Sequence, residues 1–288
     1  MKTVISASRR TDIPAFYLPW LIDCLQKRSA EIVTPRGLKK CVNLHPDHVH
    51  SLVLWSKNFH HFLKRKSAFK EYRLFFHFTL NDCPPLEPNI PDLQERLAQA
   101  QALAECFGPA CMTWRFDPVV FWEEGRKDNT GGFAYIAETM ARIGVRRCMF
   151  SFCTHYRKTI IRTRAAGIPL YDPPVERKRE TAARLGRIAR ACGIGLFACS
   201  QSGLDGIDNV AVGRCIDGAY LQELFSEKCS KARDLGQRPQ CHCTHSVDIG
   251  SYTSVCRHGC LYCYAIPGPS AAAGGKVLEN DKKNFLLS

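Results

Sequence analysis

Short apolar runs alternate with helix-like segments through most of this 288-residue chain. The runs are rich in β-branched and aromatic residues, which is typical of buried strands. Between them, residues 91–107 and 175–192 repeat apolar side chains every three or four positions, which predicts helices. This alternation favours parallel strands joined by crossover helices, arranged as a full or partial barrel or as a doubly wound sheet. The predicted strands are residues 3–8, 51–56, 74–80, 111–116, 147–153 and 195–200, with a β-hairpin at 31–45.

The character of the sequence changes after about residue 230. Residues 231–266 are dense in cysteine and show no sustained period, and residues 267–288 are rich in Pro, Gly, Ala and Lys. We therefore predict three parts. A (β/α) barrel occupies residues 1–230, a cysteine-rich iron-sulfur cap occupies 231–266, and a tail occupies 267–288.

The composition indicates a soluble folded protein, with 45% hydrophobic and 23% charged residues. The net charge of +13 would attract anionic partners, nucleic acid included, although a solvated basic surface explains it equally well. No apolar stretch approaches the roughly 18 residues of a membrane-spanning helix, so we expect no membrane partner. The N-terminal apolar run is too short for a signal peptide. In a long chain without a leader, 16 cysteines indicate the cytoplasm, where cysteine clusters bind metal more often than they form disulfides.

The motif CRHGCLYC places Cys256, Cys260 and Cys263 in one loop with the spacing C-x3-C-x2-C. Three neighbouring thiolates suit a 4Fe-4S cluster, and they leave one of its irons open to another ligand. The loop resembles that of radical SAM enzymes, in which an aromatic residue precedes the third cysteine, as Tyr262 does here. This resemblance implies that the open iron binds S-adenosylmethionine and that Tyr262 packs near its adenine.

A structural zinc site is the alternative for these cysteines. Cys241 and Cys243 could join two loop thiolates in a closed tetrahedral centre. Zinc sites more often use pairs of C-x2-C knuckles, which this chain does not supply. Some other cysteines lie on apolar segments and are expected to be buried without a ligand; these are Cys24, Cys83, Cys106, Cys148 and Cys192.

A second metal site could form from four cysteines outside the loop. Cys199 ends a predicted strand, Cys215 lies in GRCID, and Cys241 and Cys243 form a C-x-C pair. If the fold brings the strand ends under the cap, these four could ligate a second iron-sulfur cluster, and auxiliary clusters occur in the radical SAM class. Spacing alone does not show that they meet.

Motifs along the whole chain resemble an uncharacterised bacterial family of barrel proteins. They are VISASRRTDIPAFY, VLWSKN, HFTLN, WRFDPV and CHCTHSVDIGSYTSVCRHGCLYCYA, and they span the chain to about residue 266. Members of that family end in a cysteine loop similar to that of spore photoproduct lyase. The resemblance implies a TIM-like full or partial (β/α) barrel, with the cluster loop folded back over the strand ends from the C-terminus. Arg257 stands where the family has a proline.

Polar residues follow the predicted strands, where parallel barrels hold their ligands. We expect catalytic or substrate contacts from Arg9, Arg10, Asp12, Lys57, Arg115 and Asp117, and cofactor contacts from Asn58 and Thr79 beside Tyr262. Each could instead be a loop charge or a helix cap, and Asp12 before Pro14 suits an N-cap. His45, His48 and His50 lack the helical spacing of a metal site, so we expect none there. The basic run at 157–164 is better explained as a solvated helix face than as a phosphate site.

These features together predict a cytoplasmic radical SAM-type enzyme. Its 4Fe-4S cluster would cleave S-adenosylmethionine to a 5'-deoxyadenosyl radical that abstracts hydrogen from a small-molecule or nucleic-acid substrate. A reductant such as flavodoxin or ferredoxin would supply the electron. The alternative is a zinc-stabilised basic nucleic-acid-binding protein without catalysis, which the positive charge fits equally well.

Overall fold

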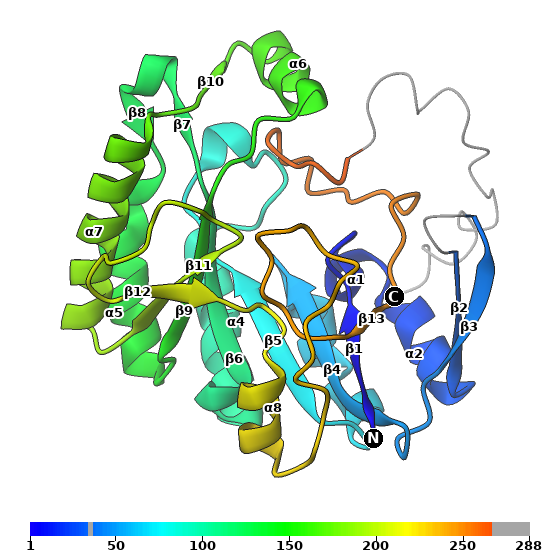
Figure 1. Ribbon diagram of the computed structural model, residues 1–288. Helices are drawn as coiled ribbons and strands as arrows, with labels where there is room; N and C mark the ends of the chain where they lie inside the picture. Colours follow the sequence, from blue (N-terminus) through cyan, green and yellow to red (C-terminus); the bar gives the residue numbers. More distant parts are fainter. Residues whose placement is uncertain (34–36, 267–288) are drawn as a thin grey trace.

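The computed structural model describes residues 1–33 and 37–266. Within them, an 8-stranded sheet runs in the order β12-β11-β9-β6-β5-β4-β1-β13, and every pairing in it is parallel (Figure 1). Its strands are β1 (Thr3–Ala7), β4 (Val49–Ser56), β5 (Leu74–Thr79), β6 (Met112–Val119), β9 (Arg147–Phe152), β11 (Gly195–Cys199), β12 (Val210–Gly213) and β13 (Val247–Asp248).

The six strands predicted from apolar runs are therefore confirmed, while β12 and β13 were not predicted. The expected hairpin is also present as the antiparallel pair β2 (Ser29–Val33) and β3 (Lys39–Asn43). A small sheet of β7 (Phe121–Trp122), β8 (Lys127–Asp128) and β10 (Leu170–Tyr171) lies outside the main one. The predicted tail, residues 267–288, lies outside the described residues.

The predicted TIM-like barrel, full or partial, was wrong, although the α/β class is confirmed. In the described part of the chain, β12 pairs with β11 and β13 pairs with β1, and the two edges of the sheet are not joined. The physical reason is the segment between them. Residues 214–246 form α8 (Gly218–Phe225) and irregular backbone, and they cover one face of the sheet instead of adding the strand-helix units that would close it.

The helices begin and end close to the predicted positions. Predicted segments 91–107 and 175–192 are α4 and α7. Asp92 caps α4 by accepting from the N–H groups of Gln94 and Glu95, and Gly108 follows its last turn at φ 85°. The α-helices are α1 (Ile13–Phe16), α2 (Leu18–Gln26), α3 (His60–Lys64), α4 (Leu93–Phe107), α5 (Phe133–Ile143), α6 (Arg157–Ala165), α7 (Val175–Ala191) and α8 (Gly218–Phe225). Short 3-10 turns are η1 (Lys66–Phe69), η2 (Pro84–Leu86), η3 (Pro109–Cys111), η4 (Glu123–Gly125) and η5 (Thr130–Gly132).

Both faces of the sheet are buried, which explains the continuous apolar runs of its strands. Neighbouring residues of each strand point to opposite faces. On one face Leu54 and Phe76 pack with α4, α5 and α7. On the other face Trp55 and Phe75 pack with α8 and the segment around Cys243. Figure 1 shows α5 and α7 on the far side of the sheet from α8. We call the α8 side the inner face.

Other sequence predictions have mixed outcomes. Cys24, Cys83 and Cys148 are buried as expected, but Cys106 is exposed and Cys192 is half-buried, because both lie at the ends of helices. Among the described residues, no helix has the length and apolar content that a membrane crossing requires.

Candidate metal centres

The cysteine loop, residues 256–263, lies over the carboxyl ends of the central strands, as the sequence predicted. The backbone N–H of Leu261 donates to the carbonyl of Leu86 in η2 (2.9 Å). Asn89 donates to the carbonyl of Arg257 (3.0 Å), and the hydroxyl of Tyr17 donates to that of Val255 (2.8 Å). The loop is therefore held from both sides by segments that follow β1 and β5.

Asp12 is the main anchor between the loop and the sheet. Its Oδ2 atom accepts from His258 Nε2 (2.8 Å) and from the backbone N–H of Lys57 (2.9 Å). Its Oδ1 atom accepts from Ser56 Oγ (2.7 Å) and from the N–H of Ala15 (3.0 Å), which confirms Asp12 as the N-cap of α1. Ala15 follows β1, Ser56 and Lys57 lie at the end of β4, and His258 lies in the loop. One buried carboxylate therefore holds these three segments together.

The three loop thiols lie within electrostatic reach of one another. Cys260 is buried, and Cys256 and Cys263 are half-buried. Burial raises the pKa of Cys256 to about 12 and also raises that of Cys260. The negative charge of an ionised Cys263 raises both values further, and Cys256 acts on Cys260 in the same way. The thiols thus act on one another electrostatically, and burial keeps Cys256 and Cys260 protonated.

Hydrogen-bond donors and a cation surround these sulfur atoms. The backbone N–H groups of Asp12 and His258 both donate to the Cys256 sulfur. The ammonium group of Lys57 lies near Cys260 and opposes the rise in its pKa. N–H donors and positive charge stabilise metal-bound thiolates, so the chemistry of this loop fits a thiolate-bound cluster.

Tyr262 and Lys57 meet at a buried carboxylate that the sequence did not indicate, Glu87. The Tyr262 hydroxyl donates to Glu87 Oε1, which also accepts from Lys57 Nζ (2.7 Å) and Asn81 Nδ2 (3.3 Å). Burial alone would raise the pKa of Glu87, but Lys57 and Tyr262 outweigh it and lower the pKa. Burial similarly opposes the charge of Lys57, while Glu87 raises its pKa. The pair is therefore ionised beside the loop.

Asn58 and Thr79, which were predicted to contact the cofactor, lie at the ends of β4 and β5. Asn58 Oδ1 accepts from the N–H of His60 (3.0 Å) and from Gln99 Nε2 (3.0 Å), so its amide orders the start of α3. Thr79 is the last residue of β5 and pairs with Arg115. Their cofactor role stays a prediction.

Arg9 and Arg10 hold the start of the chain against the segment that leads into the loop. Asp248 accepts from Ser6 Oγ (2.9 Å), Ser8 Oγ (2.7 Å) and the N–H of Arg9 (3.0 Å). The guanidinium groups of Arg9 and Arg10 lie 3.7 and 3.9 Å from the same carboxylate. Both arginines are thus engaged in binding the two termini of the described fold to each other.

Arg115 and Asp117 lie on the inner face, at the second group of cysteines. Arg115 donates to Cys215 Sγ (3.0 Å) and to Asp117, and Asp117 also accepts from Ser151 Oγ. Burial opposes the charge of Arg115, yet the negative charges of Cys215 and Asp117 raise its pKa well above the usual value. Arg115 therefore remains a buried cation beside a sulfur atom.

The structure brings together Cys199, Cys215, Cys241 and Cys243, which we call the four-thiol cluster. The sulfur atoms of Cys199 and Cys215 are 3.1 Å apart, and hydrogen bonds link Cys215 to Cys243 and Cys243 to Cys241. These bonds hold the pKa of Cys215 well below its usual value and lower that of Cys241 to about 6.

Neither group of cysteines is a finished metal site. Within residues 1–33 and 37–266, no three His, Cys, Asp or Glu side chains are already arranged to hold an ion. Protonated thiols donate hydrogen bonds to one another, whereas metal binding requires them to lose their protons and converge. In the segment with His45, His48 and His50, the ring of His50 is buried and donates to the carbonyl of Glu227 (2.9 Å).

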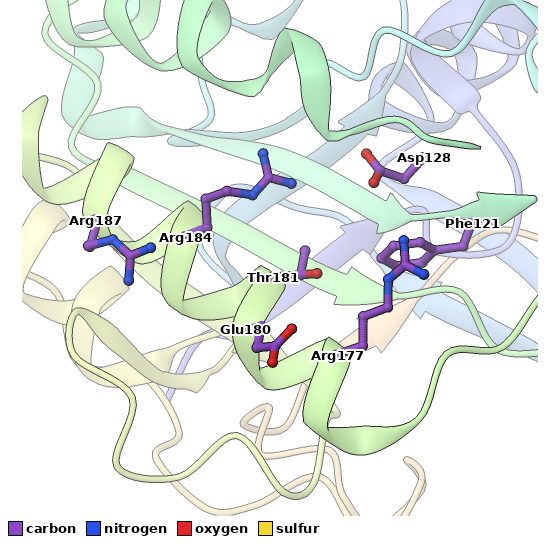
Figure 2. A pocket seen from close by; sticks show the side chains of 7 residues that line it. All are labelled: Phe121, Asp128, Arg177, Glu180, Thr181, Arg184 and Arg187. Atoms are coloured by element: carbon purple, nitrogen blue, oxygen red, sulfur yellow. The ribbon is translucent and has the colours of Figure 1, made fainter. Parts of the chain in front are cut away.

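An arginine-lined pocket of about 360 Å³ lies elsewhere, between α7 and the small sheet. Figure 2 shows Arg177 over the ring of Phe121 and Arg184 reaching in from the same helix. Arg177 donates to the carbonyl of Gly125 (2.5 Å) and Arg184 to Thr130 Oγ1 (2.5 Å). Two of its arginines are thus used to hold the small sheet.

Several residues of the site carried no sequence signal that we used. Glu87 and His258 lie in irregular segments and Asp248 lies in the two-residue strand β13, and nothing in their spacing indicated their partners. Arg162 belongs to the basic run that was expected to be solvated, but it donates to the carbonyls of Leu261 (3.1 Å) and Cys263 (3.0 Å). These contacts join residues 99 and 101 positions apart, so only the folded structure reveals them.

Comparison with known proteins gives a family but no activity. The model of a family described as a domain of unknown function, DUF1848, matches residues 4–265. No curated protein matches the sequence.

Proposed function

Since the chain belongs to the DUF1848 family, whose description states no activity, we propose its function from the site itself. It is a radical SAM-type enzyme, in which Cys256, Cys260 and Cys263 hold a 4Fe-4S cluster. S-adenosylmethionine binds at the iron that no loop cysteine ligates. When bound, the reduced cluster supplies the electron for reductive cleavage of S-adenosylmethionine.

The single observation that carries this proposal is the loop itself. Its C-x3-C-x2-C thiols lie within electrostatic reach of one another, with two backbone N–H donors aimed at Cys256. Three local thiolates match a cubane with one open corner better than they match the four ligands of structural zinc. The loop also lies at the carboxyl ends of parallel strands, where open α/β sheets bind their ligands.

Other residues at this edge are suited to a polar cofactor. The Oδ1 atom of Asn81 and the Oγ1 atom of Thr11 are buried and have no hydrogen-bond partner among the described residues. Buried polar atoms are normally paired, so these two are available to a ligand. Lys57 and Glu87 lie beside Tyr262 and would orient charged groups next to the loop.

The remaining parts of the proposal follow from charge and redox compartment. The +13 net charge favours an anionic substrate, either a small molecule or a nucleic acid. We place the protein in the cytoplasm, because a cysteine-rich metalloenzyme needs reduced thiols. A flavodoxin or ferredoxin is the partner that would reduce the cluster.

The test is cofactor cleavage. Protein purified without oxygen and reconstituted with iron and sulfide should hold about four irons per chain at the loop. After reduction in the presence of S-adenosylmethionine it should release 5'-deoxyadenosine. The variant Cys256→Ala/Cys260→Ala/Cys263→Ala should release none.

The matched control removes three cysteines away from the site, Cys41, Cys106 and Cys192, which are exposed or half-buried. This variant should cleave the cofactor as the unmodified protein does. Undiminished cleavage by the loop variant would refute the proposal. So would a colourless protein with one zinc ion bound at the loop and no 5'-deoxyadenosine.

A further inference from the structure

Four thiols from three separate segments meet on the inner face of the sheet. Cys199 ends β11, Cys215 follows β12, and Cys241 and Cys243 lie in the irregular segment before β13. Cys199 and Cys215 sulfur atoms are 3.1 Å apart, and the thiols of Cys215, Cys243 and Cys241 follow as a hydrogen-bonded chain. Residues up to 44 positions apart in sequence thus supply one compact set of soft ligands.

Hydrogen-bond donors and a cation surround the sulfur atoms of Cys215, Cys241 and Cys243. Arg115 Nη1 donates to Cys215 Sγ (3.0 Å), and its buried guanidinium also donates to the half-buried Asp117. The N–H of Ile216 donates to Cys243 Sγ (3.4 Å), and the N–H of Cys243 donates to the sulfur of Cys241. A C-x-C pair with N–H donors to its own sulfur atoms stabilises metal-bound thiolates.

A simple packing role does not explain this arrangement. Cys229 lies in the same apolar cluster of the inner face, but its thiol donates only to a backbone carbonyl, that of Gly218 (3.1 Å). A cysteine that only fills space needs no cation, and a buried arginine is costly unless it faces a negative group. The Arg115 guanidinium donates to both Asp117 and Cys215, and it also lies over the ring of Trp55.

The cluster also holds together a region that has little regular structure. Residues 214–246 form α8 and otherwise irregular backbone. Cys215, Cys241 and Cys243 are 6%, 8% and 2% exposed and connect the two ends of this segment to each other and, through Cys199, to β11. Small irregular regions of this kind are commonly stabilised by a structural metal.

We propose that Cys199, Cys215, Cys241 and Cys243 ligate a second metal centre, either one zinc ion or one iron-sulfur cluster, that fixes residues 214–246 against the inner face of the sheet. Tetrathiolate sites select these soft centres. The proposal does not depend on radical SAM chemistry, because the two sets of cysteines share no ligand.

The experiment isolates the second centre by removing the first. In the background Cys256→Ala/Cys260→Ala/Cys263→Ala, full-length protein is purified without oxygen, once from zinc-supplemented and once from iron-supplemented cells. We expect one zinc per chain, or iron with an equal amount of sulfide, to survive dialysis. Adding Cys215→Ala/Cys243→Ala should abolish this metal, whereas adding Cys229→Ala should leave it unchanged.

A second measurement covers the case in which the five-cysteine variant does not fold. Cobalt substituted into the full-length loop variant should show the visible bands of tetrahedral thiolate coordination. The single change Cys199→Ser, at a half-buried strand end, should shift those bands to shorter wavelength because oxygen replaces one sulfur.

Three results would overturn the inference. They are a loop variant that is folded but metal-free, metal that persists in the Cys215→Ala/Cys243→Ala protein, and mass spectrometry showing a Cys199–Cys215 disulfide in freshly lysed cells. The outcome is separable from the proposed function. Metal in the loop variant can be present when 5'-deoxyadenosine is absent from the intact protein, and the reverse can also hold.

Discussion

The two groups of cysteines are built in opposite ways. The loop thiols come from eight consecutive residues, 256–263, and are fixed by contacts around the loop, chiefly His258 to Asp12. The four-thiol cluster comes from three segments that only the fold brings together, and its sulfur atoms contact one another and Arg115. The loop thiols are therefore neighbours in the sequence itself, while the four-thiol cluster exists only in the folded chain. Damage to one group should therefore spare the other.

Asp12→Ala should have the largest effect and should act on the loop alone. It leaves His258 Nε2, Ser56 Oγ and two backbone N–H groups without their acceptor in a buried place. We expect about 4 kcal/mol loss in the free energy of unfolding, measured by urea denaturation. Iron bound at the loop should fall sharply while metal at the four-thiol cluster remains.

The control for this change is Asp23→Ala, an exposed carboxylate paired with Lys27 on α2. It should alter neither metal. Equal loss of both metals from Asp12→Ala would mean that the two groups are not independent.

Arg115→Met should have the converse effect. It removes the donor to Cys215 and leaves the half-buried Asp117 without its cation. We expect a loss of about 3 kcal/mol in the free energy of unfolding, and metal at the four-thiol cluster weakened about tenfold or more. Titration with a competing chelator measures the second quantity. Arg146→Met, at an exposed arginine that donates to the carbonyl of Ala141, is the control. Unchanged metal affinity in Arg115→Met would show that Arg115 does not support metal binding at the four-thiol cluster.

Gly250→Ala tests the contact between Ser8 and Asp248, which joins the start of the chain to the segment that leads into the cysteine loop. A Cβ atom at this position would lie 1.9 Å from Ser8 Oγ, which donates to Asp248. The same atom would lie 2.4 Å from Ser8 Cβ, so turning the hydroxyl would not relieve the clash. The backbone would have to shift, at a cost of about 2 kcal/mol in the free energy of unfolding. Gly131→Ala, where nothing lies within 4 Å of the added atom, is the matched change. A melting temperature equal to that of Gly131→Ala would show that the Ser8 contact is dispensable.

Cys153→Ala should have the smallest effect, and it tests whether the loop has a fourth thiol ligand. Cys153 packs with Cys260 and Cys263 in one apolar cluster, and Cys263 contributes to the raised pKa of Cys153. If the loop leaves one iron open, this change costs about 1 kcal/mol for the cavity and leaves iron content and cofactor cleavage intact. Cys83→Ala, in the same cluster, should behave alike. Loss of iron from Cys153→Ala, with iron retained in Cys83→Ala, would mean that Cys153 is a fourth ligand and that no iron of the cluster is open.

Sequence predicted the parts of this molecule that depend on local pattern. Both faces of the sheet are buried, so six strands appeared as apolar runs, and α4 and α7 showed their own period. The strand β13 has two residues and no such run, so it was missed. The barrel prediction failed for a related reason. Nothing periodic in residues 214–246 indicated that they would cover the inner face in place of further strands.

The same distinction applies to the site: features set by local sequence could be predicted, and contacts made only by the fold could not. The grouping of the loop cysteines could be predicted because all three lie within eight consecutive residues, while their role as ligands stays a prediction. Asp12 was predictable as a helix cap, but its bond to His258 joins residues 246 positions apart and has no local signature. Arg115 was predicted from its place at a strand end, yet its sulfur partner could not be predicted, since Cys215 reaches it only through the course of the chain after β12.

The pairing of β13 with β1 sets an order of events during synthesis. Ser6, Ser8 and Arg9 leave the ribosome long before their shared acceptor, Asp248, which lies 239 to 242 positions further along the chain. Until then one edge of β1 lacks its partner strand, and Asp12 lacks its hydrogen bond from His258. Domains fold as units once their chain is complete. The nascent protein must therefore keep its first strand from pairing with other chains until translation has passed the final cysteine loop.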